Sequence, residues 1–133
     1  MTQPFPDIAS RTDIERLVNH FYGLVRQDEI LGPIFNEVAR VDWDRHLPKM
    51  YAFWDKVLFG VPGFQGNPLA AHLALATRTP LGAREFDRWL ELFRTSVRAL
   101  FRGSVADEAV ERAVRIAAVM QQHLALVPAA QPD

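Results

Sequence analysis

Cysteine is absent from the sequence, which excludes disulfides, thiolate zinc sites, iron–sulfur clusters and cysteine nucleophiles together. Long hydrophobic runs are also missing: one of the longest, Ile116–Met120, has about five residues, whereas a membrane-spanning helix needs about 20. Neither sign of charge dominates, because 15 Lys and Arg residues stand against 16 Asp and Glu residues and leave a net charge of -1. We therefore expect neither nucleic acid nor a membrane as a partner.

A secretory signal is not evident at the N-terminus. Residues 1–10 carry two prolines and one acidic residue but no basic region and no apolar stretch, so a cytoplasmic location is expected. The 133 residues are 49% hydrophobic and 23% charged, which is typical of one globular domain with a sizeable core. We expect a single domain over residues 1–133, with its core at about 12–127 and flexible ends at 1–10 and 129–133.

Apolar residues recur at intervals of three and four along most of the chain, which is the period of amphipathic helices. No run of strict apolar alternation bounded by turn residues indicates a strand. The fold class is therefore predicted to be all-α. The expected helices, separated by stretches rich in Gly and Pro, are 12–27, 43–58, 68–76, 83–102 and 105–127.

The ends of these helices carry local signals. Thr12 and Glu15 have the spacing of a capping box, and Asp42 can cap the second helix. Pro48 falls inside that second helix, which predicts either a kink or a true start near His46. Gly103 is the expected stop of the fourth helix and Pro128 that of the last, and the pair Asn67 and Pro68 is typical of a cap and first turn.

Four histidines are present, and none belongs to a zinc-protease motif or a nucleophile elbow. His72 shares the apolar side of a short helix with Leu69, Leu73 and Ala76, and His46 shares a helix face with Met50 and Phe53. A lone histidine in such a place is more often a hydrogen-bonded core residue than a ligand. From the residues alone, either histidine fits a structural role as well as a functional one.

Other polar side chains have equally plain interpretations. Tyr22 and Trp89 each combine a large apolar body with one polar group, which fits core filling as well as ligand binding. Arg94, Arg98 and Arg102 form a basic stripe, but acidic residues precede them on the same helix. Cations near a helix C-terminus are stabilised by the helix dipole, so a solvated face is the favoured interpretation of the stripe.

Six short segments follow one another in a distinctive order: Phe21-Tyr22, Leu31–Phe35, Trp43–His46, Phe53-Trp54, Gly66–His72 and Phe86–Leu90. In this order they resemble the truncated haemoglobins, and among these the third group. The resemblance covers roughly residues 14 to 120. It implies a truncated globin fold, a two-over-two helical sandwich around a haem b, in which the short helix 68–76 and the loop before it are held largely through the bond from His72 to the iron.

The resemblance also implies roles for individual residues. His72 matches the proximal histidine that binds the haem iron, and Phe35 matches the phenylalanine that stacks on the porphyrin. Tyr22, His46 and Trp89 match the polar distal residues of this group. Lys49, one turn beyond His46, is a candidate partner for a haem propionate. The residues that can form the walls of the haem slot, although core packing explains each equally well, are Phe35, His46, Met50, Phe53, Trp54, Leu73 and Phe93.

The function implied by the resemblance is a haem-binding globin that takes dioxygen, nitric oxide, carbon monoxide or other small ligands, with an unidentified reductase as partner. Donors such as Tyr22 and Trp89 predict slow oxygen release. Slow release favours redox chemistry on nitric oxide or peroxide, of a dioxygenase or peroxidase-like kind, over reversible oxygen transport. One alternative of another class stays open, namely a non-haem helical module that binds an apolar ligand or a partner helix.

Overall fold

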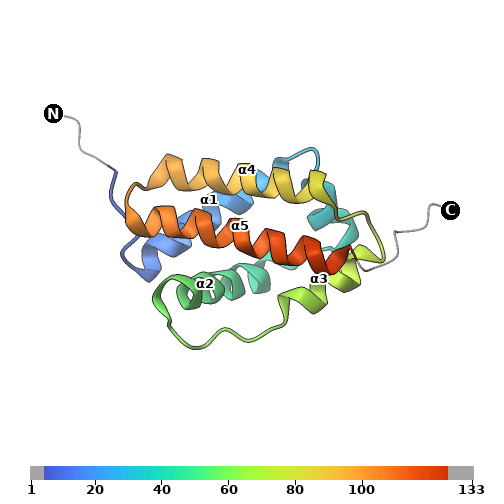
Figure 1. Cartoon of the computed structure of the whole chain (residues 1–133), viewed down its shortest axis with the longest axis horizontal. Helices are drawn as coiled ribbons and strands as arrows, with labels where there is room; N and C mark the ends of the chain where they lie inside the picture. Colours follow the sequence, from blue (N-terminus) through green and yellow to red (C-terminus); the bar gives the residue numbers. More distant parts are fainter. Residues whose placement is uncertain (1–4, 126–133) are drawn as a thin grey trace.

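The computed structural model describes residues 5–125, and all regular secondary structure within that range is helical, as predicted. Along the chain lie α1 (Arg11–Gln27), the short π-helix η1 (Ile34–Val38), α2 (Trp43–Phe59), α3 (Pro68–Ala76), α4 (Ala83–Leu100) and α5 (Ser104–Leu124). Helices α1 and α2 pack on each other, α4 packs on α5, and the two pairs meet where α1 contacts α4 (Figure 1). The result is the expected two-over-two arrangement of helices.

Local capping explains where α1 and α2 begin. Ser10, rather than the predicted Thr12, caps α1 by accepting a hydrogen bond from the Asp13 N–H. Asp42 caps α2 through the Asp44 N–H, so the helix starts at Trp43 and the predicted start near His46 is wrong. The helix continues through Pro48, its sixth residue, and loses there one backbone hydrogen bond, the one to the Asp44 carbonyl.

The connection from α4 to α5 also differs from the prediction. Helix α4 ends at Leu100 rather than Arg102, and the extended residue Phe101 turns its ring into the core, where it is 1% exposed. Gly103, with φ 142°, then leads directly into α5. Helix α5 ends at Leu124, and the predicted stop at Pro128 lies outside the described residues.

The core reaches further toward the N-terminus than the sequence predicts. Ile8 is 1% exposed and belongs to the main hydrophobic core, although the core was expected to begin near residue 12. The Asp7 carboxylate accepts the N–H groups of Val105 and Ala106 and thereby caps α5. This close approach requires Gly103, because a Cβ there would lie 2.4 Å from the Asp7 carboxylate carbon. Long-range capping therefore fixes a segment that has no helical pattern of its own.

Two kinds of packing form the core. On α5, four small residues, Ala106, Ala109, Ala113 and Ala117, are at most 2% exposed and let the helix approach α4 closely. Between α1, α2 and α4 the packing is aromatic: Trp54 and Trp89 both stack on Phe93, at ring-centroid distances of 4.8 and 5.7 Å. In the described range, no helix has the length and apolar character needed to cross a membrane.

Candidate functional site

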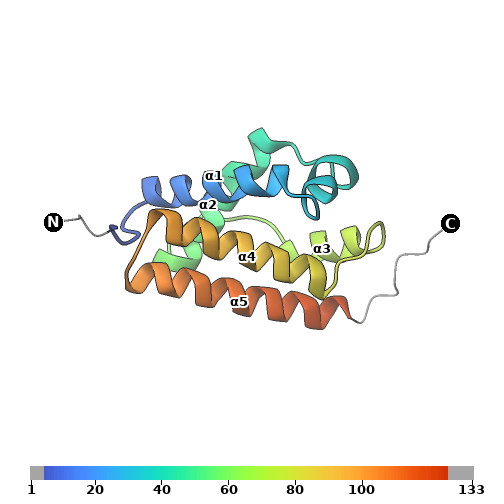
Figure 2. The same ribbon diagram turned by 90° about the horizontal axis from the view of Figure 1, so that it is seen from above.

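Helix α3 is apolar, yet the protein covers little of it. Asn67 caps it by accepting a hydrogen bond from the Ala70 N–H, and Pro68 occupies its first turn. The helix ends at Ala76, so both predicted ends are confirmed. The helix packs on α5 and stands apart from α1, between two long loops (Figure 2). Only Ala76 is buried, whereas Leu69, Leu73 and Leu75 remain partly exposed. An apolar face that is left half-covered indicates an apolar occupant.

His72 lies in the middle of this half-covered helix. Its Nδ1 atom is 2.6 Å from the backbone carbonyl oxygen of Pro68, one turn earlier. The carbonyl can only accept, so Nδ1 carries the proton and Nε2 keeps its lone pair. A metal-binding histidine is typically oriented in this way, with one ring nitrogen held by a carbonyl and the other available as a ligand.

Across from α3, four aromatic side chains from α1, η1 and the start of α2 contact one another. The Tyr22 ring lies 5.1 Å from His46, 5.3 Å from Trp43 and 5.9 Å from Phe35, measured between ring centroids. Tyr22 is 7% exposed, and burial raises the pKa of its phenol above the ordinary value. Tyr22 is therefore a neutral phenol at physiological pH, able to donate one hydrogen bond.

His46 supplies the second polar group of this cluster. Burial lowers the pKa of its imidazole, and the nearby positive charge of Lys49 lowers it further, so the ring is neutral at pH 7. Within residues 5–125, His46 Nε2 is the one buried side-chain nitrogen or oxygen that has no hydrogen-bond partner. A buried polar atom without a partner is costly and is frequently found where a ligand supplies the missing bond.

The other predicted site residues fall into three groups. Met50, Phe53 and Leu73 are half-buried, as expected of walls that a ligand would cover, and Trp89 is also half-buried. Trp54 and Phe93 are 4% and 1% exposed and stack on each other within the core, behind the partly exposed Trp89. Lys49 is exposed on the surface of α2.

Trp43 is a residue of the site for which the sequence predicted no role. Its ring stacks on Phe35 at 5.9 Å and meets His46 edge-on at 5.6 Å. The guanidinium of Arg26 lies 4.7 Å from the centre of the Trp43 ring. The available signal was its position directly after the Asp42 cap and one turn before His46, which places both side chains on the same face of α2.

Two histidines and the arginine stripe lie elsewhere. His20 Nδ1 is 3.0 Å from the hydroxyl of the fully buried Ser96, so this partly buried histidine links α1 to α4. His123 is exposed near the end of α5. Arg94 and Arg98 line a shallow hollow on α4 together with Asp87 and Glu91, and this mixture of charges fits the solvated face that the sequence indicated.

Comparison with known proteins places this site in a family. The family model for bacterial-like globins matches residues 4–125. The chain is 33% identical over 121 residues to the group 3 truncated hemoglobin ctb of Campylobacter jejuni, with 89% of this chain and 93% of that protein covered. The crystal structure of a group III truncated hemoglobin from the same organism superposes with a TM-score of 0.79 at 32% identity, covering 92% of this chain and 95% of the other. The chain belongs to the group III truncated haemoglobins.

Membership among the truncated haemoglobins confirms the expected globin fold and implies a haem cofactor, and the residues of the site fit one. His72 offers a lone pair on Nε2, and the uncovered side of α3 offers an apolar surface. Within residues 5–125 no three His, Asp or Glu side chains gather in a way that could hold a metal ion. A metal at His72 therefore needs its other ligands from a cofactor, as a porphyrin provides.

Proposed function

We propose that this truncated haemoglobin holds a haem b through His72 and binds dioxygen, nitric oxide or carbon monoxide beside Tyr22, His46 and Trp89. The hydrogen bond from His72 Nδ1 to the Pro68 carbonyl carries this proposal. It fixes the ring nitrogen that remains free and makes the imidazole more basic as a ligand. The uncovered apolar side of α3 supports the same assignment, because a macrocycle would bury it.

The haem would supply an iron centre with an open coordination position for a diatomic ligand. The chain's own residues determine how that ligand is held. The neutral Tyr22 phenol and the Trp89 indole are donors, and the neutral His46 imidazole can donate or accept. The partly exposed side chains of Phe35, Met50 and Phe53 would form an apolar wall of the haem slot and exclude water from it. Lys49, exposed beyond His46, would pair with a haem propionate.

This set of donors supports retention of the ligand for redox chemistry rather than oxygen transport. Each well-placed hydrogen bond to a charged group contributes about 1.5–3 kcal/mol, and each such bond slows ligand release. A protein that shuttles oxygen needs ready release. A pocket with several donors is suited to hold dioxygen or a peroxide, or to react with nitric oxide, with electrons from a reductase that is not yet identified. Family membership favours the haem globin over the alternative of a non-haem helical module.

Absorption spectroscopy of the ferric, ferrous and carbonmonoxy forms tests the assignment of His72. We expect His72→Ala to hold haem weakly, with exogenous imidazole restoring the spectrum of the parent protein. His20→Ala and His123→Ala are matched controls, since His20 is bonded to Ser96 and His123 is exposed. An unaltered spectrum in His72→Ala would overturn the proposal.

A further inference from the structure

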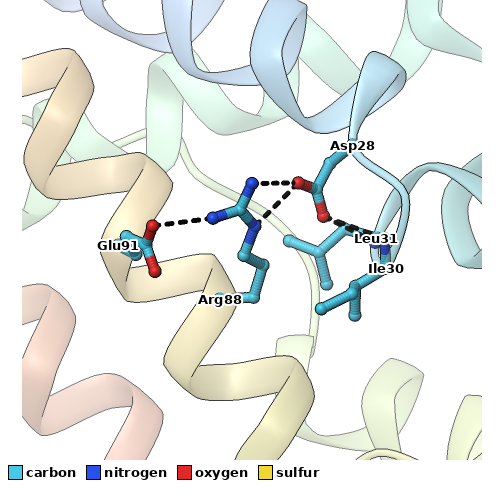
Figure 3. A network of polar contacts seen from close by, with 5 residues as sticks. All are labelled: Asp28, Ile30, Leu31, Arg88 and Glu91. Atoms are coloured by element: carbon cyan, nitrogen blue, oxygen red, sulfur yellow. Dashed lines mark hydrogen bonds and ion pairs between the residues drawn. The ribbon is translucent and has the colours of Figure 1, made fainter.

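A buried carboxylate joins the end of α1 to α4 (Figure 3). Asp28 directly follows α1, and its side chain is only 4% exposed. Its Oδ1 accepts a hydrogen bond from Arg88 Nε at 2.7 Å and forms an ion pair with Nη2, also at 2.7 Å. Its Oδ2 accepts the N–H groups of Ile30 at 3.1 Å and Leu31 at 3.0 Å. The remaining Arg88 nitrogen, Nη1, pairs with the exposed Glu91 at 2.7 Å.

On one side this network determines where η1 begins. The turn after α1 is tight: the Gly32 N–H bonds to the Asp28 carbonyl at 2.9 Å, and a Cβ on Gly32 would lie 3.0 Å from the Arg26 carbonyl oxygen. The Phe35 N–H then bonds to the Leu31 carbonyl at 3.1 Å. Because the Asp28 carboxylate holds the Leu31 N–H, it also fixes the start of the segment that carries Phe35.

On the other side the network fixes a point on α4 next to Trp89. Arg88 is the residue before Trp89, and a guanidinium whose Nε and Nη2 both lie 2.7 Å from one carboxylate oxygen, while its Nη1 pairs with Glu91, has little freedom to rotate. Burial alone would raise the pKa of Asp28, but the hydrogen bonds from Arg88, Leu31 and Ile30 outweigh burial and lower it below the ordinary value. The carboxylate is therefore charged at neutral pH, and its ion pair with Arg88 is intact. We call this pair the Asp28–Arg88 clamp.

We propose that Asp28 and Arg88 are positioning residues for the distal pocket. Their ion pair sets the separation between Phe35 on η1 and Trp89 on α4, and it thereby aims the Trp89 indole N–H at the bound ligand. Neither Asp28 nor Arg88 touches that ligand. The inference rests on the proposed function, because it takes Trp89 as a distal donor.

The test uses the carbonmonoxy holoprotein and the C–O stretching frequency, which reports hydrogen bonding to the ligand. We expect Asp28→Asn and Arg88→Gln to shift the band upward, in the direction of Trp89→Phe but less far. Arg88→Lys should give an intermediate shift, because an ammonium keeps the charge and loses the paired geometry. In a Trp89→Phe background, Asp28→Asn should add no further shift.

Two controls separate positioning from general loosening of the fold. Glu91→Gln removes the exposed partner of the same arginine and should leave the band unchanged. Asp7→Asn removes a carboxylate that also accepts two successive N–H groups, at the N-terminus of α5, and should lower the unfolding midpoint without moving the band. Helix α5 begins at the end of the molecule opposite to α3 (Figure 2).

Several outcomes would overturn the inference. These are an unmoved band in both Asp28→Asn and Arg88→Gln, an equal shift in Asp7→Asn, or an additional shift in the Trp89→Phe background. Failure of the proposed function looks different, because a parent protein that takes up no haem gives no carbonmonoxy spectrum. Circular dichroism of every variant identifies any protein that fails to fold. If Asp28→Asn or Arg88→Gln fails to fold, the shift of the C–O band in Arg88→Lys tests the inference.

Discussion

We propose Tyr22, Phe35, Trp43 and His46 for the distal side of the site and α3 for its proximal side. The first four side chains contact one another, with ring centroids separated by 5.1 to 6.4 Å. On the proximal side, α3 exposes part of nearly every apolar residue it has, and only Ala76 is buried. The distal side is anchored to its neighbours by the Asp28–Arg88 pair and by packing on the aromatic core. The proximal side is joined to the rest of the chain by α5 and two loops.

The difference shows which part of the site depends on the cofactor. Aromatic rings that pack on each other contribute to stability in the apoprotein as well as in the holoprotein. A half-covered apolar helix contributes little until a ligand buries it, because the hydrophobic effect scales with the area removed from water. We therefore expect the distal half to be preorganised and the proximal half to be ordered by haem.

Removal of haem should have the largest effect on this comparison. Amide exchange in residues 60–82 should accelerate strongly in the apoprotein, whereas α1 keeps its protection, because the cofactor stabilises only the native arrangement of α3. A ligand at about 1,000 times its dissociation constant adds about 4 kcal/mol to stability. Equal protection of residues 60–82 with and without haem would contradict the expected difference between the two halves.

Loss of one distal donor should have the next largest effect. Each hydrogen bond to a charged group contributes about 1.5–3 kcal/mol, so Tyr22→Phe and Trp89→Phe should release oxygen roughly 10- to 150-fold faster in stopped-flow experiments. His46→Leu measures the contribution of the third polar group. If the parent protein releases oxygen quickly and none of the three substitutions changes the release rate, the result would favour simple oxygen transport over redox chemistry.

A pair of core substitutions compares the two halves directly. Trp43→Leu should lower the unfolding free energy by about 1–2 kcal/mol in both the apoprotein and the holoprotein, because its contacts with Phe35 and His46 lie within the protein. Leu73→Ala should cost a similar amount in the holoprotein and clearly less in the apoprotein, where its side chain is already partly exposed. Urea unfolding of both forms provides the measurement, and an equal apoprotein cost for the two variants would count against preorganisation.

The smallest predicted effect is the pH dependence of the stabilisation that the Asp28–Arg88 clamp provides. Hydrogen bonds hold the pKa of Asp28 below its ordinary value of 3.8 despite burial, so the stabilisation is complete above 3.8 and is lost as the pH falls through the lower folded value. The difference in unfolding free energy between the parent and Asp28→Asn should therefore shrink by about 1 kcal/mol below pH 3.8. A difference that stays constant from pH 7 to pH 2 would argue against a charged clamp.

The sequence predicted α3 accurately, because its signals are local. Asn67 and Pro68 fix the start of α3 through contacts within one turn, and both ends of that helix are where the sequence placed them. The start of α1 was misplaced although its cap is local, because Ser10 rather than Thr12 accepts a helix N–H. The start of the core and the end of α4 were misplaced because the deciding interactions are not local. Phe101 leaves its helix to bury its ring, and Ile8 joins a core formed by residues far along the chain.

The same division holds for the candidate site. The order of short segments was sufficient to indicate the truncated haemoglobins, and the bond from His72 to Pro68 follows from helix geometry, since the two residues are one turn apart. The role of Trp43, the buried and unpartnered His46 Nε2 and the Asp28–Arg88 clamp depend on how separate elements meet. Helical period and capping are encoded within a few residues, so the sequence by itself determined the helices and the family. Only the tertiary structure decided which side chains desolvate one another and which apolar face is left for a ligand, because burial depends on the packing of the whole chain.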